Sequence, residues 1–255
     1  MVESAGDRGA ALVTGAGQRI GRAIALTLAR AGYGIAIHCH RSRDGADTLA
    51  NDIEQLGRRS AILVADLADQ EAVAGLVPAA ANALGPLTLL VNNAAMFEPD
   101  EIGSLARERW QHQFEINLAA PVFLAEAFAA QAPGGSAVVN IIDQRVFKLT
   151  PHFFSYTLTK SALATATRTL AQALAPRIRV NGVAPGPTLA SPRQDAAEFA
   201  RQAALLPLGH GPSPQDIADA VLFLANAGST TGVILAVDGG QHVAWKTPDT
   251  EGIRE

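Results

Sequence analysis

The sequence has a single cysteine, and this scarcity excludes two kinds of construction. Cys39 is the only cysteine among 255 residues. An internal disulfide framework and a cysteine-ligated metal site are therefore both excluded, and we expect no metal site. A chain of this kind is typical of the reducing cytoplasm, so we expect a cytoplasmic protein.

An excess of charge of one sign is also missing. Charged residues make up 17% of the chain, the formal net charge is −4, and no run of Lys or Arg stands out. Binding to nucleic acid or to an anionic membrane surface usually relies on such a run. We therefore expect neither nucleic acid nor a membrane as a partner.

Long apolar runs are absent as well. No run is long enough to span a bilayer. The first residues include an acid and lead almost directly into a strand, so we expect no signal peptide. Hydrophobic residues nevertheless make up 48% of the chain. That share supports a large core and excludes extensive disorder.

Patterns typical of strands and helices alternate along the whole chain. Short apolar strands are predicted at 10–14, 34–39, 61–65, 87–91, 137–142, 177–183 and 233–237, with helices between them. No linker or repeat interrupts this alternation. It predicts an α/β fold, with a single Rossmann-type doubly wound domain over 1–255 and a parallel sheet of about seven strands covered by helices on both faces.

A glycine-rich loop follows the first predicted strand and precedes a helix. Its glycines are Gly15, Gly17 and Gly21, a spacing wider than the G-x-G-x-x-G pattern. Glycines in this context let the backbone approach a pyrophosphate, while the N–H groups at the helix start point at it. Many strand-to-helix turns contain glycine, but the elements that follow favour a dinucleotide site.

The end of the second strand indicates which dinucleotide binds. An acidic residue here usually holds the ribose of NAD, whereas this chain has His38, His40, Arg41 and Ser42. Arg41 and Ser42 suit the 2′-phosphate of NADPH, and Arg19 in the glycine loop adds a second positive charge. The alternative is two solvated arginines and a helix cap at Ser42.

Polar residues also follow later strands. Asp66 follows the third predicted strand and either accepts from an adenine amino group or caps the next turn. Asp143 ends the fifth, at the edge where open α/β sheets bind ligands. Tyr156 and Lys160 are four residues apart on a predicted helix over 155–175 and share one face. We expect Asp143, Tyr156 and Lys160 to meet, although a packing tyrosine and a solvated lysine are the simpler alternatives.

The helix predicted over about 105–131 contains Pro121. A proline cannot bond the carbonyl four residues back, here that of Asn117, so we expect a kink and a carbonyl free to hold a water. A kink with no such purpose is the alternative. Residues 118–130 are apolar nearly all round, which predicts burial against a partner subunit as well as the sheet. Prolines crowd the segment at about 185–213, which we interpret as a substrate lid, and a polar tail follows at 241–255.

Taken together, these motifs resemble the short-chain dehydrogenase/reductase family over nearly the whole chain. The matching segments are 14–21, 92–94, Asn117, Tyr156 with Lys160, 179–183 with Pro185 and Gly186, and 238–240. Most of that family has a serine where this chain has Asp143. That departure, with Arg19-Ile20, the run from His38 to Ser42, and Phe97 after Asn-Asn-Ala, resembles the pteridine reductases.

The resemblance implies an NADPH-dependent reductase that transfers hydride to a pterin-type ring, with a cytoplasmic homotetramer as the family habit. It makes Asp143, Tyr156, Lys160 and Asn117 catalytic: Lys160 lowers the pKa of Tyr156, and Asn117 holds a relay water. It places the substrate against Phe97, Arg19, Asp143 and Tyr156. A core position for Phe97, a ketone reductase of the same fold and a non-catalytic dinucleotide sensor are the alternatives.

The cofactor site implied by the resemblance spans several strand ends. Its residues are Gly15, Gly17, Arg19, Ile20, Gly21, His38, Arg41, Ser42, Asp66, Leu67, Asn93, Ala94, Tyr156, Lys160, Pro185, Gly186 and Thr188.

Overall fold

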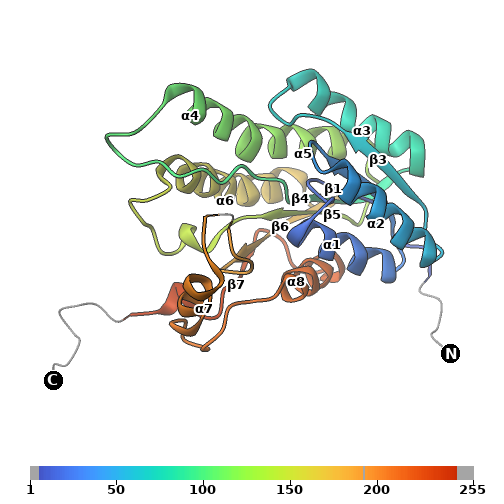
Figure 1. Ribbon diagram of the computed structural model, residues 1–255. Coiled ribbons are helices and arrows are strands. Elements are labelled where there is room, and N and C mark those ends of the chain that lie inside the picture. Colours follow the sequence, from blue (N-terminus) through green and yellow to red (C-terminus); the bar gives the residue numbers. More distant parts are fainter. Residues whose placement is uncertain (1–5, 192, 246–255) are drawn as a thin grey trace.

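Seven parallel strands form one sheet in this computed structural model, which describes residues 6–191 and 193–245 (Figure 1). The sheet order is β3-β2-β1-β4-β5-β6-β7. The strands are β1 (Ala10–Val13), β2 (Gly34–Cys39), β3 (Ser60–Val64), β4 (Leu87–Asn92), β5 (Ser136–Ile141), β6 (Ile178–Pro185) and β7 (Ile234–Val237). The chain order reverses between β1 and β4, which is where doubly wound sheets form their ligand crevice.

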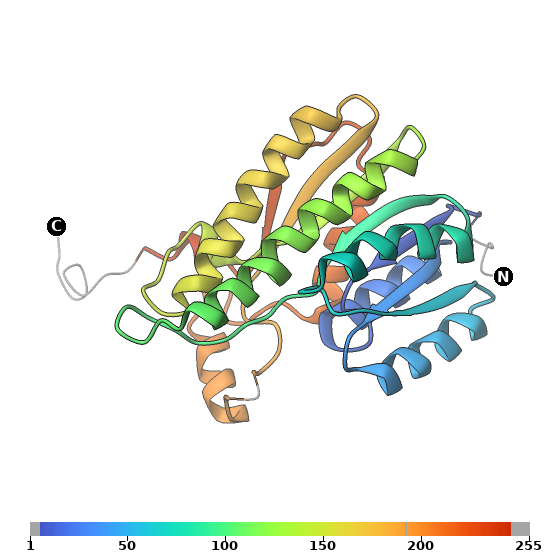
Figure 2. The ribbon, with the colours of Figure 1, turned by 90° about the horizontal axis from the view of Figure 1, so that it is seen from above.

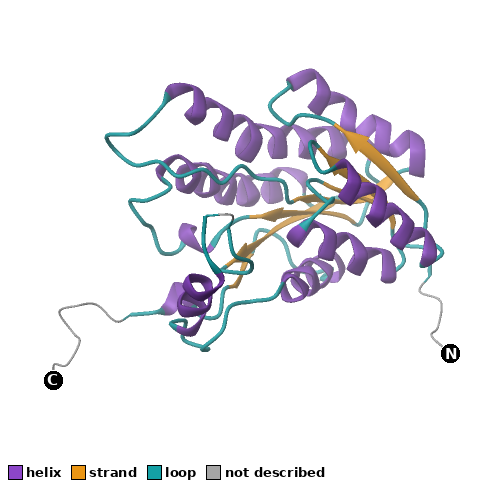
Figure 3. Ribbon diagram, in the orientation of Figure 1, coloured by secondary structure: helices purple, strands orange, loops and turns teal. Residues whose placement is uncertain are grey.

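Helices cover both faces of the sheet (Figures 1 and 3). The first face carries α1 (Arg19–Arg30), α2 (Arg43–Gln55) and α8 (Pro214–Asn226). The opposite face carries α3 (Gln70–Leu84), α4 (Arg107–Phe114), α5 (Ala120–Gln131) and α6 (Phe154–Leu174). A short helix, α7 (Ala196–Ala204), stands apart from both layers within the predicted lid (Figure 2). The predicted fold class is confirmed.

The central strands are apolar throughout because both of their faces are buried. In β1, Ala11 and Val13 pack in a core with α1, α2 and α8, whereas Ala10 and Leu12 pack in a second core with α3 and α5. Successive side chains of a strand point to opposite faces, so one short run supplies both cores. This explains why the strands read as continuous apolar runs and not as alternating patterns.

The long helix predicted over 105–131 is divided by a π turn, η1 (Glu115–Ala119), between α4 and α5. Pro121 lies just beyond this turn and has no N–H for the regular helical bond. Wider turns of this kind occur mostly inside helices and often near functional sites. The predicted interruption is therefore a local widening of the helix. In Figure 2 the combined helix runs alongside α6.

The remaining short elements follow strand ends. They are the 3₁₀ turns η2 (Gln144–Val146), after β5, and η3 (Gln241–Val243), after β7. Within residues 6–191 and 193–245, no helix has the length and apolar character that a membrane crossing requires. The same residues contain no cluster of His, Cys, Asp and Glu that could hold a metal ion. The tail beyond residue 245 and Pro192 of the lid lie outside the described residues.

Candidate active site

A cleft of about 970 Å³ follows the carboxyl ends of the strands. Its walls come from the carboxyl ends of successive strands and the segments that follow them, among them His38 and 40–42 at β2, 66–67 after β3, 93–99 after β4, 141–145 around the end of β5 and 185–189 at the end of β6. This is the edge of the sheet at which the sequence predicts the functional residues. Nearly all of them line the cleft; Gly17 and Asn117 are the two exceptions.

The glycine loop is packed too tightly for side chains. Gly15 has φ +63°, a conformation that glycine adopts without strain. A Cβ on Gly21 would lie 2.2 Å from the Gly15 carbonyl oxygen. A Cβ on Gly17 would lie 2.5 Å from Ser42 Oγ, and one on Gly45 of α2 would lie 2.2 Å from the Gly17 carbonyl oxygen. Gly17 therefore serves the packing of the loop onto α2.

Buried polar side chains fix the position of this loop. His38 Nδ1 accepts from the Gly15 N–H at 3.1 Å, and His38 Nε2–H donates to the Ala65 carbonyl at 3.1 Å. Burial lowers the pKa of His38, which favours the neutral ring that this pair of bonds requires. Asn93 Nδ2 donates to the Thr14 carbonyl at 2.8 Å and to that of Gly15 at 3.2 Å. Both side chains hold the loop that faces the cleft.

The residues expected to select the cofactor line one end of the cleft. Arg41 and Ser42 both face it. The Ser42 hydroxyl makes no capping bond to α2, so the alternative of a simple helix cap is not supported. Asp66 accepts from the Ala68 N–H at 3.0 Å, so it caps its turn while it also lines the cleft. Two donors, one of them charged, thus line the cleft next to each other, and this donor set fits the 2′-phosphate of NADPH.

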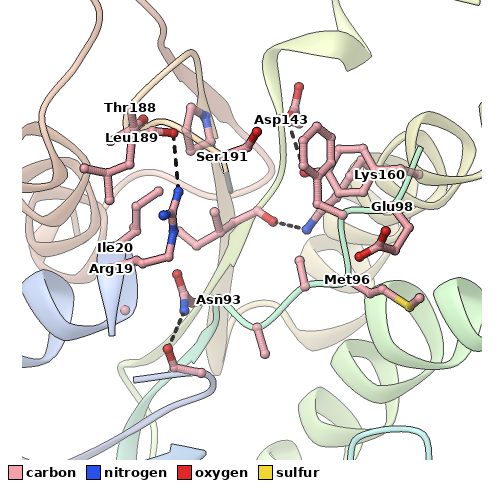
Figure 4. A pocket seen from close by; sticks show the side chains of 18 of the residues that line it. Arg19, Ile20, Asn93, Met96, Glu98, Asp143, Lys160, Thr188, Leu189 and Ser191 are labelled. Carbon is pink, nitrogen blue, oxygen red and sulfur yellow. Dashed lines mark hydrogen bonds between the residues drawn. The ribbon is translucent and has the colours of Figure 1, made fainter. Parts of the chain in front are cut away.

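Arg19 makes contacts that the sequence does not predict, and the second positive charge expected of it at the cofactor site stays a prediction. Its backbone has φ 52°, and its guanidinium donates to the carbonyls of Leu189 at 3.3 Å and Ala190 at 3.1 Å (Figure 4). The glycine loop is thereby tied directly to the predicted lid. The side chain still lines the cleft.

The three ionisable residues predicted to meet do so. Tyr156 OH donates to Asp143 Oδ2 at 3.1 Å, and Lys160 Nζ donates to the Ile141 carbonyl at 2.7 Å (Figure 4). Tyr156 is 6% exposed and Lys160 is 1% exposed. Because α6 begins at Phe154, the first two turns of the helix present both side chains to the end of β5.

One electrostatic prediction is wrong. Lys160 was expected to lower the pKa of Tyr156, but burial, and next the Asp143 carboxylate, raise that pKa well above its usual value. The reason is geometric: the phenol bonds the carboxylate, while the ammonium bonds a backbone carbonyl. Burial lowers the pKa of Lys160 itself to about 8, and Asp143 opposes that shift. Tyr156 therefore keeps its proton at neutral pH.

Arg145 is a site residue to which sequence reasoning gave no role. Its backbone N–H donates to Asp143 Oδ1 at 2.8 Å, and its Nη1 lies 3.2 Å from both carboxylate oxygens. The side chains are only 21% and 15% exposed, so this ion pair is shielded from water. The sequence signal for this role is a basic residue, Arg145, two positions after the unusual carboxylate of Asp143.

Phe97 lines the cleft as predicted, and it has an aromatic neighbour that was missed. Its ring stacks on Phe153, with centroids 4.3 Å apart and planes 7° apart, and meets Tyr156 edge to face at 4.7 Å. Phe153 immediately precedes α6 and has φ 56°, which is strained for a bulky residue. The alternative of a core Phe97 is excluded, because the side chain is only partly buried and borders the cleft.

Asp100 caps α6 from a distant loop. Phe153, the residue at the helix start, offers no side-chain cap. Asp100 instead accepts from the Ser155 backbone N–H at 3.0 Å and also from the Ser155 hydroxyl. Asp100 is 6% exposed and Ser155 is fully buried. A carboxylate at the N-terminal end of a helix also stabilises the helix by interacting with its dipole.

Asn117 lies behind the cleft. Its side chain accepts from the Met96 N–H at 2.8 Å and donates to the Met96 carbonyl at 2.9 Å. It thus holds the segment that carries Phe97. Its predicted hold on a relay water stays a prediction.

Comparisons with known proteins agree with this geometry. Residues 15–242 match the family described as Enoyl-(Acyl carrier protein) reductase. The structure is similar to those of FolM alternative dihydrofolate reductase 1, complexed with NADP, from Brucella canis (49% identity, 95% of this chain, 97% of that chain, TM-score 0.92) and Brucella suis (50% identity, 95% and 98%, TM-score 0.92). D-erythrulose reductase of Gallus gallus is 34% identical, over 90% of this chain and 94% of that protein. The chain belongs to the short-chain dehydrogenase/reductase family of oxidoreductases.

Proposed function

We propose that this protein is an NADPH-dependent reductase that transfers hydride to a pterin-type ring: a dihydropterin, biopterin or dihydrofolate. The observation that carries the proposal is the bond from Tyr156 OH to Asp143 at 3.1 Å, beside the ring of Phe97. A carboxyl in this place suits a ring nitrogen, because a carboxylate accepts from N–H and a carboxylic acid donates to N. The similarity to two proteins named as alternative dihydrofolate reductases supports the same substrate class.

The cofactor is held along the strand ends. Arg41 and Ser42 bind the 2′-phosphate, and the glycine loop from Gly15 to Gly21 receives the pyrophosphate. Ile20, Leu67, Ala94, Pro185, Gly186 and Thr188 all line the same cleft. Lys160 holds the nicotinamide ribose. NADPH, when bound, supplies the hydride.

Tyr156 supplies the proton. Reduction of a ring C=N bond adds hydride to carbon and a proton to nitrogen. The buried phenol of Tyr156 keeps its proton at neutral pH, and it is the group that would pass a proton to that nitrogen. Asp143 orients the phenol through their hydrogen bond. The Arg145 guanidinium lies 3.2 Å from the Asp143 carboxylate and holds it in place. Asn117 would hold a water behind Lys160, and a proton from solvent would return to Tyr156 through that water.

Phe97 provides a flat apolar surface for the substrate ring. Its face is fixed by Phe153 on one side and by contact with Tyr156. Aromatic pairs of this kind are worth roughly 0.5–1.5 kcal/mol beyond area burial. A planar heterocycle gains from this surface, whereas a small aliphatic ketone gains less.

Reduction of a ketone by the same machinery is the second candidate, favoured by the similarity to D-erythrulose reductase. Asp143 argues against it, because most of the family uses a serine hydroxyl to hold a carbonyl oxygen. The test is NADPH oxidation with dihydrobiopterin, dihydrofolate, quinonoid dihydropterin and a panel of ketones. We expect turnover of pterins, and we expect Asp143→Ser to lose most of it. Reduction of ketones alone, or pterin reduction untouched in Asp143→Ser, would reject the proposal.

We further propose a cytoplasmic homotetramer. Phe123 of α5 is 57% exposed and Leu158 of α6 is 37% exposed, on helices that lie side by side. Exposed apolar residues on adjacent helices suit burial by a second copy of the chain. Light scattering on the purified protein checks the mass, and a monomer at micromolar concentration would contradict the proposal.

A further inference from the structure

Two arginines from separate segments converge on the stacked rings of Phe97 and Phe153. Arg145 lies in η2 after β5, and its guanidinium carbon is 5.3 Å from both ring centroids. Arg193 lies in the predicted lid, 5.4 and 5.8 Å from the same centroids. Each guanidinium thus lies within cation–π distance of both rings. All four side chains line the cleft.

The guanidiniums of Arg145 and Arg193 each have N–H donors beyond those that they use on neighbouring residues. A guanidinium has five N–H groups. Arg145 uses Nη1 on Asp143, and its Nε is buried without a partner among the described residues. Arg193 donates Nη2 to the Phe97 carbonyl at 2.9 Å, while its Nη1 lies 3.6 Å from Glu98, too far for a hydrogen bond. A buried donor without a partner marks a place where a ligand acceptor is favoured.

The charge around the cleft supports an anionic ligand group. Its lining holds five basic side chains, Arg19, Arg41, Arg145, Lys160 and Arg193, against three acidic ones, Asp66, Glu98 and Asp143. The chain as a whole has a net charge of −4, so this cleft is locally positive. The Glu98 side chain is 45% exposed, so solvent screens its ion pair with Arg193. Clefts lined by one sign of charge raise the local concentration of oppositely charged ligands.

We propose, building on the pterin-reductase function, that Arg145, Arg193 and Phe153 form a subsite for an aromatic, carboxylate-bearing substrate tail, beside the Phe97 surface that takes the pterin ring. A flat aminobenzoyl ring matches the Phe153 ring, and carboxylates match the spare guanidinium donors. The substrate class is then a folate, with its aminobenzoyl-glutamate tail, in preference to a pterin whose side chain is neutral. Arg193 acts on specificity, whereas Arg145 also bonds Asp143.

The first experiment compares kcat/KM for dihydrofolate and dihydrobiopterin. We expect Arg193→Gln to lower the dihydrofolate to dihydrobiopterin ratio about tenfold, the loss of one charge-assisted contact. Arg201→Gln is the matched control, because Arg201 is an exposed arginine of α7 outside the cleft, and its ratio should match the wild type. High ionic strength should also lower the wild-type ratio and affect the Arg193→Gln ratio less. A ratio that Arg193→Gln leaves unchanged would overturn the subsite.

The second experiment does not depend on turnover. Calorimetry measures binding of p-aminobenzoyl-glutamate, and of neutral p-aminobenzamide, to the NADP-loaded protein. We expect the acidic fragment to bind more tightly, and Arg193→Gln to remove that advantage. Equal affinity for the two fragments would refute the inference even if pterins are reduced. Absence of any pterin reduction would reject the proposed function, while fragment binding would still decide the subsite.

Discussion

Replacing Asp100 with alanine removes the carboxylate that caps α6, the helix that carries Tyr156 and Lys160. The Ser155 N–H and hydroxyl then lose their acceptor in a position where Ser155 has no exposed surface. An unpaired buried donor costs about 1–3 kcal/mol, so the two together should lower the free energy of unfolding by about 2–6 kcal/mol. For a chain of this length, that is a fall in Tm of roughly 4–24 °C.

Urea and thermal denaturation measure this loss, with two controls. The first control, Glu101→Gln, changes the adjacent acid, which contacts His152. The side chains of Glu101 and His152 are 59% and 70% exposed, so this contact should contribute under about 1 kcal/mol to stability. Asp100→Asn keeps one acceptor oxygen and should lose about half as much as alanine. The double variant Asp100→Ala with Ser155→Ala should lose less than the sum of the single changes. Strictly additive losses, or an Asp100→Ala cost no larger than that of Glu101→Gln, would refute the capping argument.

Three further outcomes are expected at the active site. Tyr156→Phe should lower kcat roughly 10²–10⁴-fold with cofactor affinity retained, and near-normal turnover would remove the proton-donor role. Arg41→Ala should weaken NADPH binding about tenfold or more and NADH binding little, and equal weakening of both would reject the 2′-phosphate contact. The pKa of Lys160 is about 8 in the folded protein and about 10.4 in the unfolded chain. Between these pH values the lysine is protonated only in the unfolded chain, so the free energy of unfolding should rise with pH, by about 3 kcal/mol in all. Denaturation measured across this range should lose the rise in Lys160→Met, and a wild-type curve that stays flat would contradict the assigned pKa.

The sequence predicts the parts of this protein that depend on local pattern. Apolar runs bounded by glycine and polar residues give the seven strands, because buried parallel strands need continuous apolar side chains. The end of β6 was placed too early, at Val183. The strand continues to Pro185, which pairs with Val237 of β7, and such pairing between distant segments leaves little local signal.

The site divides in the same way. Asp143, Tyr156 and Lys160 were recognised because strand ends and helical spacing bring them together. Asp100 was missed because it acts across 55 positions of sequence, on a helix start that has no cap of its own. The sequence does not predict the direction of the Tyr156 pKa shift, because that direction depends first on how deeply the phenol is buried and next on the Asp143 carboxylate beside it.

The close packing of Gly17 on Ser42 and of Gly45 on Gly17 limits how coenzyme preference can be engineered. Neither backbone has room for even one added carbon, so the segment after β2 cannot be reshaped by introducing side chains at these two glycines. A switch to the non-phosphorylated coenzyme must therefore be made by exchanging the side chains at 41 and 42 in place. Redesign libraries that hold both glycines constant and diversify only those two positions should retain far more folded members than libraries that vary the loop itself.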